Sequence, residues 1–120
     1  MKPLADIQLT GDIPAKKNLW KRGARGGMYI SADTKKQLDD FLYQLKKFRP
    51  ARPIESPCEV KMEIFTRTMR ADGDGIMTTI FDLLQKAGVI KNDRWIVDFS
   101  VRRRKADKSV AFIEIFPVRL

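Results

Sequence analysis

The sequence of 120 residues contains no histidine and a single cysteine. Without histidine the chain cannot build a Ser-His-Asp triad, a histidine-dependent nuclease site or a zinc site with imidazole ligands. One cysteine, Cys58, provides neither an intrachain disulfide nor a four-cysteine zinc site, and we interpret it as a small buried hydrophobe. Any reaction on phosphate esters must therefore use carboxylates, a metal ion, lysine and arginine.

Long apolar segments are also missing. No run approaches the roughly 18 residues that a transmembrane helix needs, and the first residues lack the features of a secretory signal. No segment forms a basic amphipathic helix with Trp or Phe anchors, so an anionic membrane is not the expected partner. We therefore expect a cytoplasmic protein.

Positive charge is abundant. Lysine and arginine number 24 against 15 aspartate and glutamate, which gives a net charge of +9 and an isoelectric point near 9.9. Hydrophobic residues make up 43% of the chain, enough for a globular core in one domain of this length. A basic globular domain of this kind is expected to bind a polyanion such as nucleic acid.

The apolar periodicity predicts an α+β fold, a small mixed sheet with two helices packed on it in the order ββαβαββ. Ser31 is a predicted N-cap, and Gly88 is expected to end the second helix. Strands are predicted over residues 6–10, 28–30, 58–66, 95–103 and 110–118, and helices over residues 32–48 and 75–87. The last two strands are predicted to form a hairpin through residues 105–109.

Three carboxylates bracket the second helix. Asp72 and Asp74 precede it, and Asp93 follows it and is expected to return to the same edge of the sheet. Such oxygen ligands suit Mg²⁺ or Mn²⁺, and a divalent ion between them and a phosphate would explain acidic groups in a basic protein. The structural alternative stays open, because aspartate is also a favoured helix N-cap and turn residue.

Basic residues are expected to contact phosphates of the nucleic acid backbone. They lie in three segments. The first is the glycine-containing loop over residues 11–27, which also carries Trp20; the second directly follows the predicted strand over residues 58–66, and the third is the run over residues 102–105. The predicted contacts are Lys16, Lys17, Lys21, Arg22, Arg25, Arg67, Arg70, Arg102 and Arg104. A solvated charged surface is the alternative interpretation.

The second helix is apolar over a wide arc. Ile76, Ile80, Leu83 and Ala87 can face the sheet, which leaves residues 77, 81 and 84 for a second surface. That surface suits a homodimer, although deeper burial within the monomer would explain the pattern equally well.

The stretch over residues 70–98 resembles the RusA family of Holliday junction resolvases, through Asp72-Gly73-Asp74, the apolar helix and Asn92-Asp93. Residues 14–18, Pro-Ala-Lys-Lys-Asn, resemble the family's Pro-x-x-Lys-Asn segment. The resemblance implies a single RusA-like endonuclease domain over residues 1–120, from a bacterium or phage, that dimerises and cuts four-way or branched DNA with Mg²⁺. It also implies that Asp72, Asp74 and Asp93 are the catalytic carboxylates.

Two positions depart from the family pattern. Gly75 stands where the family has asparagine, and Thr78 stands where it has a catalytic lysine. We expect a cation from the N-terminal loop, Lys17 or Lys16, to substitute for that lysine. Otherwise the chain is a branched-DNA-binding protein that cuts poorly. An RNA-binding domain is a third hypothesis, disfavoured because no RNP-type aromatic motif or GxxG clamp is present.

Overall fold

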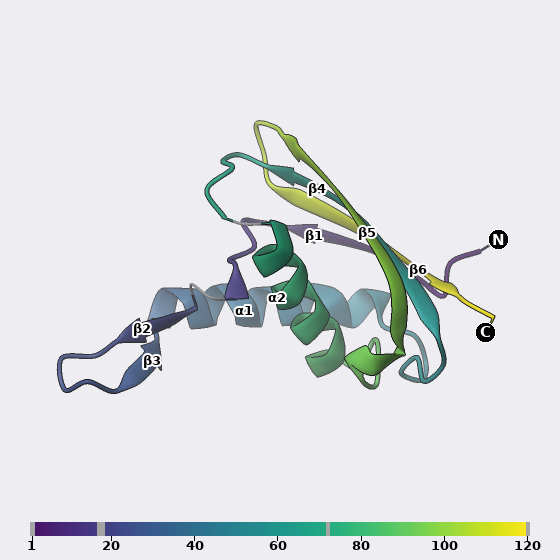
Figure 1. The fold of residues 1–120 in the computed structure, drawn as a ribbon, viewed down its shortest axis with the longest axis horizontal. Helices are drawn as coiled ribbons and strands as arrows, with labels where there is room; N and C mark the ends of the chain where they lie inside the picture. Colours follow the sequence, from purple (N-terminus) through teal and green to yellow (C-terminus); the bar gives the residue numbers. More distant parts are fainter. Residues whose placement is uncertain (1, 17–18, 72, 120) are drawn as a thin grey trace.

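The computed structural model describes residues 2–16, 19–71 and 73–119, and its elements are drawn in Figure 1. The α+β class predicted from the sequence is confirmed. The strands are β1 (Ala5–Thr10), β2 (Trp20–Arg22), β3 (Met28–Ile30), β4 (Cys58–Thr66), β5 (Ile96–Lys105) and β6 (Val110–Pro117). The helices are α1 (Ala32–Leu45) and α2 (Gly73–Lys86), with short 3₁₀ turns at Lys46–Phe48 and Asp93–Trp95.

The main sheet has the strand order β1-β6-β4-β5, in which β4 and β5 are parallel and the other pairs are antiparallel. The predicted hairpin between the last two strands is therefore wrong, because β4 lies between them. The turn residues at 105–109 indicate a reversal of the chain, but they do not decide which strand pairs with which. Helix α2 forms the crossover that returns the chain from the end of β4 to the start of β5.

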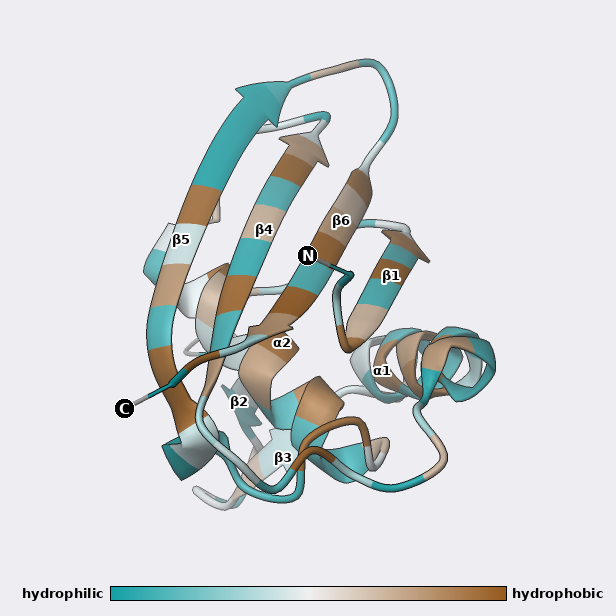
Figure 2. Ribbon diagram, turned by 90° about the vertical axis from the view of Figure 1, so that its right-hand side faces the viewer, coloured by the Kyte–Doolittle hydropathy of each residue, from teal (hydrophilic) through white to brown (hydrophobic). Residues whose placement is uncertain are grey.

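Both helices pack on one face of the main sheet. Along β4, Cys58, Val60, Met62 and Ile64 are buried beneath them, while the intervening side chains face the other way. Figure 2 shows the same alternation of hydrophobic and hydrophilic residues along β4, β6 and β1. The opposite face of the sheet carries no helix among the described residues, so the core lies in a single layer between sheet and helices.

The helix boundaries follow local sequence signals. The Ser31 hydroxyl accepts a hydrogen bond from the Thr34 backbone N–H at 3.2 Å, which confirms the predicted N-cap of α1. Gly88 has φ of +77°, a conformation that favours glycine and that ends α2 as predicted. In the described part of the chain, no helix is both long enough and apolar enough to cross a membrane.

Strands β2 and β3 form a separate hairpin that extends away from the body of the protein (Figure 1). The sequence predicted a loop where β2 lies, so the observed order is βββαβαββ. The pairs Trp20–Ile30, Lys21–Tyr29 and Arg22–Met28 define its register. An isolated two-stranded hairpin is marginally stable, and every side chain in this one is exposed except that of Ile30, which is half-buried.

Candidate metal and nucleic-acid site

The N-terminal end of α2 presents a carboxylate to solvent. Asp74 lies in the first turn of the helix, where its Oδ1 accepts a hydrogen bond from the Gly75 backbone N–H at 2.9 Å. The Thr78 hydroxyl donates to the backbone oxygen of Asp74 at 2.8 Å. Asp72, the second predicted ligand at this end, lies outside the described residues. The positive end of the helix dipole favours negative charge at this position.

The segment containing Pro14, Ala15 and Lys16 docks against the same end of α2. A Cβ atom at Gly75 would lie 2.7 Å from the Cβ of Ala15, so only glycine permits this contact. The Thr79 hydroxyl reinforces it by donating to the Pro14 backbone oxygen at 2.7 Å. Gly75, which stands where the resembling family has asparagine, thus has a packing reason in this chain.

Docking of that segment brings Lys16 to the flank of α2. Its ammonium forms an ion pair with Asp82 at 2.9 Å, and both side chains are partly exposed. Lys17, which we predicted to be the substitute catalytic cation, lies outside the described residues. Lys16 is therefore held two to three helical turns from Asp74, because its partner Asp82 lies eight residues further along α2.

Asp93 lies at the opposite end of α2. Its backbone N–H donates to the Gln85 side-chain oxygen at 3.0 Å, and about 16 Å of helix separates Gln85 from Asp74. The expectation that Asp93 returns to the same edge of the sheet is wrong for a single chain, because α2 carries the chain to the start of β5. Within the described ranges, no three acidic, cysteine or histidine side chains are close enough to hold a metal.

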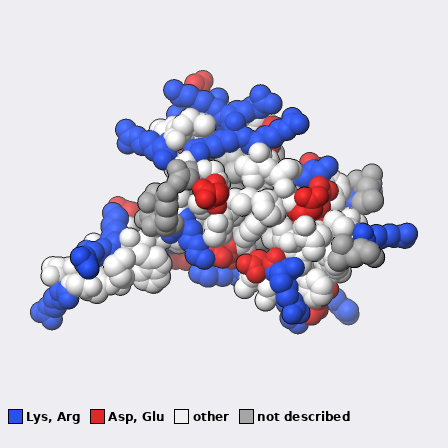
Figure 3. Space-filling model, in the orientation of Figure 1, with Lys and Arg blue, Asp and Glu red and all other residues white. Residues whose placement is uncertain are grey.

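An apolar strip joins these two ends along the outer side of α2. Phe81 contacts Phe99 of β5, with ring centroids 5.7 Å apart, and Met77 lies one turn earlier on the helix. Phe99 is 49% exposed and Val97 is 45% exposed. The prediction that Leu84 shares this second surface is wrong, since Leu84 is fully buried in the core. Figure 3 shows uncharged surface interrupted by acidic side chains across the middle of this face.

The basic run at the end of β5 divides between the two faces of the sheet. Arg102 and Arg104 are exposed beside Glu63 and Phe65 of β4, on the face that the helices leave open. Arg103 points the other way and donates to the backbone oxygens of Ala71 and Thr68. Sequence reasoning missed Arg103, although the alternation of the strand places it on the covered face, next to Ile64.

Arg70 and Arg103 line a hollow of about 310 Å³ beside the start of α2. Arg67, also predicted to bind nucleic acid, forms an ion pair with Asp12 at 2.5 Å. Hydrogen bonds from Arg67 and Ser109 lower the pKa of Asp12, and the Asp12 carboxylate raises the pKa of Arg67. Arg67 therefore serves a structural ion pair as well as adding positive charge near the site.

Lys21, Arg22 and Arg25 are exposed on the β2–β3 hairpin, as the predicted phosphate contacts require. Figure 3 shows lysine and arginine gathered along this hairpin and again over the end of the sheet where β4 and β5 finish. Two basic regions thus flank the start of α2, where the Asp74 carboxylate is exposed.

Comparison with known protein families gives one match over most of the chain. The family described as Endodeoxyribonuclease RusA matches residues 11–116, which run from the end of β1 into the last strand. Comparison with curated proteins found no match. The family consists of nucleases that resolve Holliday junctions, and the two-helix α+β fold is consistent with it. The chain therefore belongs to the RusA family of endodeoxyribonucleases.

Proposed function

We propose that this protein is an endonuclease that resolves Holliday junctions during DNA recombination and repair, by hydrolysing phosphodiesters with Mg²⁺ or Mn²⁺. We infer further that residues 1–120 act as a single domain in the cytoplasm of a bacterium or of a phage-infected cell. The observation that carries the proposal is the exposed Asp74 carboxylate at the start of α2, flanked by basic residues, in a chain of this family.

The donor set fits a hard divalent cation. Asp72, Asp74 and Asp93 offer only carboxylate oxygens, which Mg²⁺ and Mn²⁺ prefer. When bound, such an ion lowers the pKa of a water molecule and stabilises negative charge on the attacked phosphoryl group. The exposed position of Asp74 leaves room for a phosphate beside it, and the helix dipole favours the negative charge that gathers there.

The distance between Asp74 and Asp93 supports a site shared between two subunits. About 16 Å of helix separates Asp74 from Gln85, whose side chain holds the Asp93 backbone, and metal–oxygen contacts of about 2 Å do not bridge the two ends of α2 within one chain. In a two-fold homodimer with α2 helices antiparallel, Asp93 of the partner subunit would lie beside Asp74. The apolar strip of Met77, Phe81, Val97 and Phe99 would form the self-complementary contact. Two equivalent sites would then cut two strands symmetrically.

DNA binding would combine the two basic regions. Arg70 follows β4, Arg102 and Arg104 lie in the last part of β5, and Lys16, Lys17, Lys21, Arg22 and Arg25 belong to the N-terminal segment and the hairpin in the sequence. Backbone contacts of this kind predict a log–log salt slope near roughly −0.9 per phosphate neutralised. Preference for a four-way junction over a linear duplex should survive moderate salt, because the shape of the junction adds to the charge.

The missing family lysine requires a substitute. Since Ala15 packs on Gly75 and Lys16 pairs with Asp82, Lys17 is our candidate for the cation that stabilises the transition state. Lys17→Ala should then depress the single-turnover rate far more than the junction affinity, and Thr78→Lys should change little. The opposite pattern, a faster Thr78→Lys enzyme and an unchanged Lys17→Ala enzyme, would reject Lys17.

Mixing two inactive variants tests the whole proposal. Asp74→Asn and Asp93→Asn should each fail to cut a synthetic four-way junction in Mg²⁺. If each site takes Asp74 from one subunit and Asp93 from the other, a mixed dimer retains one intact site. The mixture should then regain nicking of one strand. A junction that is cut by neither the wild type nor the mixture refutes the function, and an active wild type with an inactive mixture refutes only the shared site.

A branched-DNA-binding protein with weak catalysis is the second candidate. It is favoured by Thr78, whose hydroxyl is engaged with the Asp74 backbone and supplies no positive charge. Incubation with a four-way junction and Mg²⁺, beside a linear duplex of the same sequence, separates the two candidates. Tight junction binding without measurable cutting would favour this second function.

A further inference from the structure

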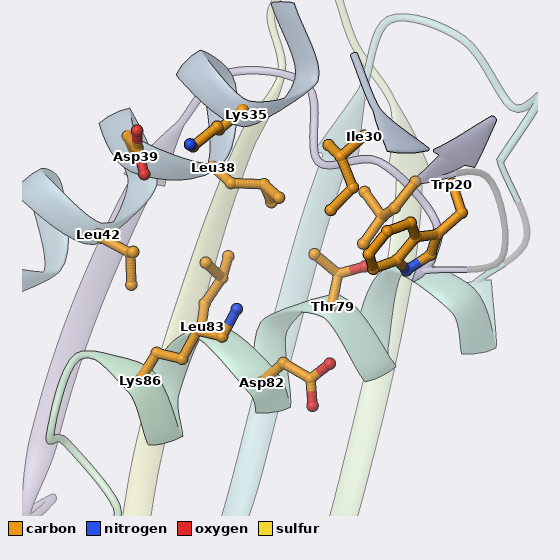
Figure 4. A pocket seen from close by; sticks show the side chains of 11 residues that line it. Trp20, Ile30, Lys35, Leu38, Asp39, Leu42, Thr79, Asp82, Leu83 and Lys86 are labelled. Atoms are coloured by element: carbon orange, nitrogen blue, oxygen red, sulfur yellow. The ribbon is translucent and has the colours of Figure 1, made fainter. Parts of the chain in front are cut away.

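A cavity of about 420 Å³ lies between α1, α2 and the base of the β2–β3 hairpin. Leu19, Ile30, Leu38, Leu42 and Leu83 supply most of its walls, and Trp20 forms one side. Figure 4 shows Trp20 reaching from β2 toward Thr79 of α2, with Asp82 one turn further along the helix. The volume lies within the roughly 300–1,000 Å³ of small-molecule sites.

The polar groups around this cavity carry both signs of charge. Lys35 and Asp39 come from α1, and Asp82 and Lys86 come from α2. Two carboxylates disfavour a phosphate in the cavity, and two ammonium groups disfavour a purely apolar occupant. The edge of a nucleobase carries both hydrogen-bond donors and acceptors, and its flat face can stack on an aromatic ring. The chemistry of the lining therefore matches a nucleobase.

The hairpin carries basic residues next to Trp20, which lines the cavity. Arg22 lies on the same face of the hairpin as Trp20 and Ile30, and Lys21 lies between Trp20 and Arg22 in β2. Trp20 is 53% exposed, so its ring is accessible to a ligand as well as being part of the cavity wall. A strand bound along the hairpin would thus bring its bases close to this aromatic ring.

We propose that this cavity receives one unstacked nucleobase from the branch point of the bound DNA, with the base stacked on Trp20. The inference rests on the proposed function, because a protein that binds branched DNA meets bases that are already partly unpaired at the branch point. Taking a base out of the stack has a cost, which is lowest where pairing is already disrupted. The cavity would therefore contribute to the selection of junctions over linear duplexes.

Photocrosslinking tests this proposal directly. A four-way junction with 5-iodouracil at one branch-point position would be bound in Ca²⁺, irradiated and digested, and the crosslinked residue identified by mass spectrometry. We expect the crosslink on Trp20. Trp20→Ala should lower its yield at least tenfold and weaken junction binding by roughly fivefold or more, the loss of one base–aromatic stack. Trp20→Phe, which keeps a ring, should retain the crosslink.

Tyr29→Ala is the matched control. Tyr29 is 47% exposed on the same hairpin, pairs with Lys21 and does not line the cavity, so the variant should crosslink like the wild type. A junction that binds but crosslinks elsewhere, or not at all, overturns the inference alone. A dimer that Trp20→Ala converts to monomers in sedimentation also overturns it, since the cavity would then be a subunit contact. Failure to bind any junction overturns this inference together with the proposed function.

Discussion

The two ends of α2 both carry a functional carboxylate in our proposal, but they are held in different ways. At the N-terminal end, Gly75 lies so close to Ala15 that even a methyl group would collide. At the C-terminal end, Gly88 has a positive φ, and the Gln85 side chain accepts a hydrogen bond from the Asp93 backbone. At the first end, steric contact with Ala15 therefore decides which residue can occupy position 75. At the second end, the positive φ decides which residue can occupy position 88.

The largest expected effect is on catalysis at the N-terminal end. Asp74→Asn should lower the rate of junction cutting by roughly a hundredfold or more, since it weakens a proposed metal ligand. Junction affinity should stay equal or rise slightly, because a negative charge beside phosphate is lost. Single-turnover cleavage and gel-shift titration measure the two quantities. Asp107→Asn removes the same charge from the turn before β6 and should cut normally, whereas undiminished cutting by Asp74→Asn would remove Asp74 from the site.

Gly75→Ala should test the steric limit at the same end. Overpacking against Ala15 should cost about 1–3 kcal/mol of unfolding free energy, partly offset by the better helix propensity of alanine. Gly73→Ala is the control, because a Cβ atom there meets nothing within 4 Å. Urea denaturation should therefore separate the two variants, with Gly73→Ala as stable as the wild type or more so. Equal stability of the two would show that the segment near Ala15 yields at little cost.

Gly88→Ala should test the conformational limit at the other end. An L residue in the left-handed region costs about 1–2 kcal/mol, although the nearest atom, Arg49 Cδ, is 3.6 Å away and leaves room for a methyl group. Gly88→Asn should cost less, because asparagine tolerates this conformation better. If alanine and asparagine destabilise the protein equally, contact with neighbouring atoms rather than backbone conformation limits this end.

The smallest expected effect is in the ion pair of Asp12 with Arg67, where Asp12 lines the hollow beside the start of α2. The pKa of Asp12 is lowered in the folded protein, chiefly by the hydrogen bond from Arg67. The resulting stabilisation is present above the ordinary carboxyl pKa and is lost as the pH falls through the lowered value. The stability difference between wild type and Asp12→Asn in urea should therefore be small at neutral pH and vanish in acid. A difference that persists in strong acid would exclude the ion pair as its cause.

Local features were predictable from the sequence because short-range signals determine them. The alternation of β4, the Ser31 cap and the glycine after α2 all follow from residues that are close together in the sequence. The position of Asp93 and the pairing of β5 depend instead on contacts distant in sequence. Once β4 and β5 are parallel, a crossover helix must carry the chain to the other end of the sheet, so Asp74 and Asp93 must separate.

The missed strand and the missed arginine have similar causes. Residues Trp20–Arg22 are too few and too polar to give a strand pattern, and only pairing with β3 makes them one. The run over residues 102–105 was known to alternate between faces, but which face was covered depended on the register with β4. Arg103 consequently lies on the face of the sheet that the helices cover and donates to the Ala71 backbone oxygen, while its neighbours remain exposed.

Cys58 gives the molecule a built-in chemical reporter of unfolding. The thiol is fully buried in a central strand of the sheet, and burial raises its pKa. Because the thiolate is the reactive form, a thiol-specific reagent should label the folded protein very slowly. The rate of labelling would then follow the opening of the sheet itself, and a ligand that stabilises the folded form would slow it in proportion.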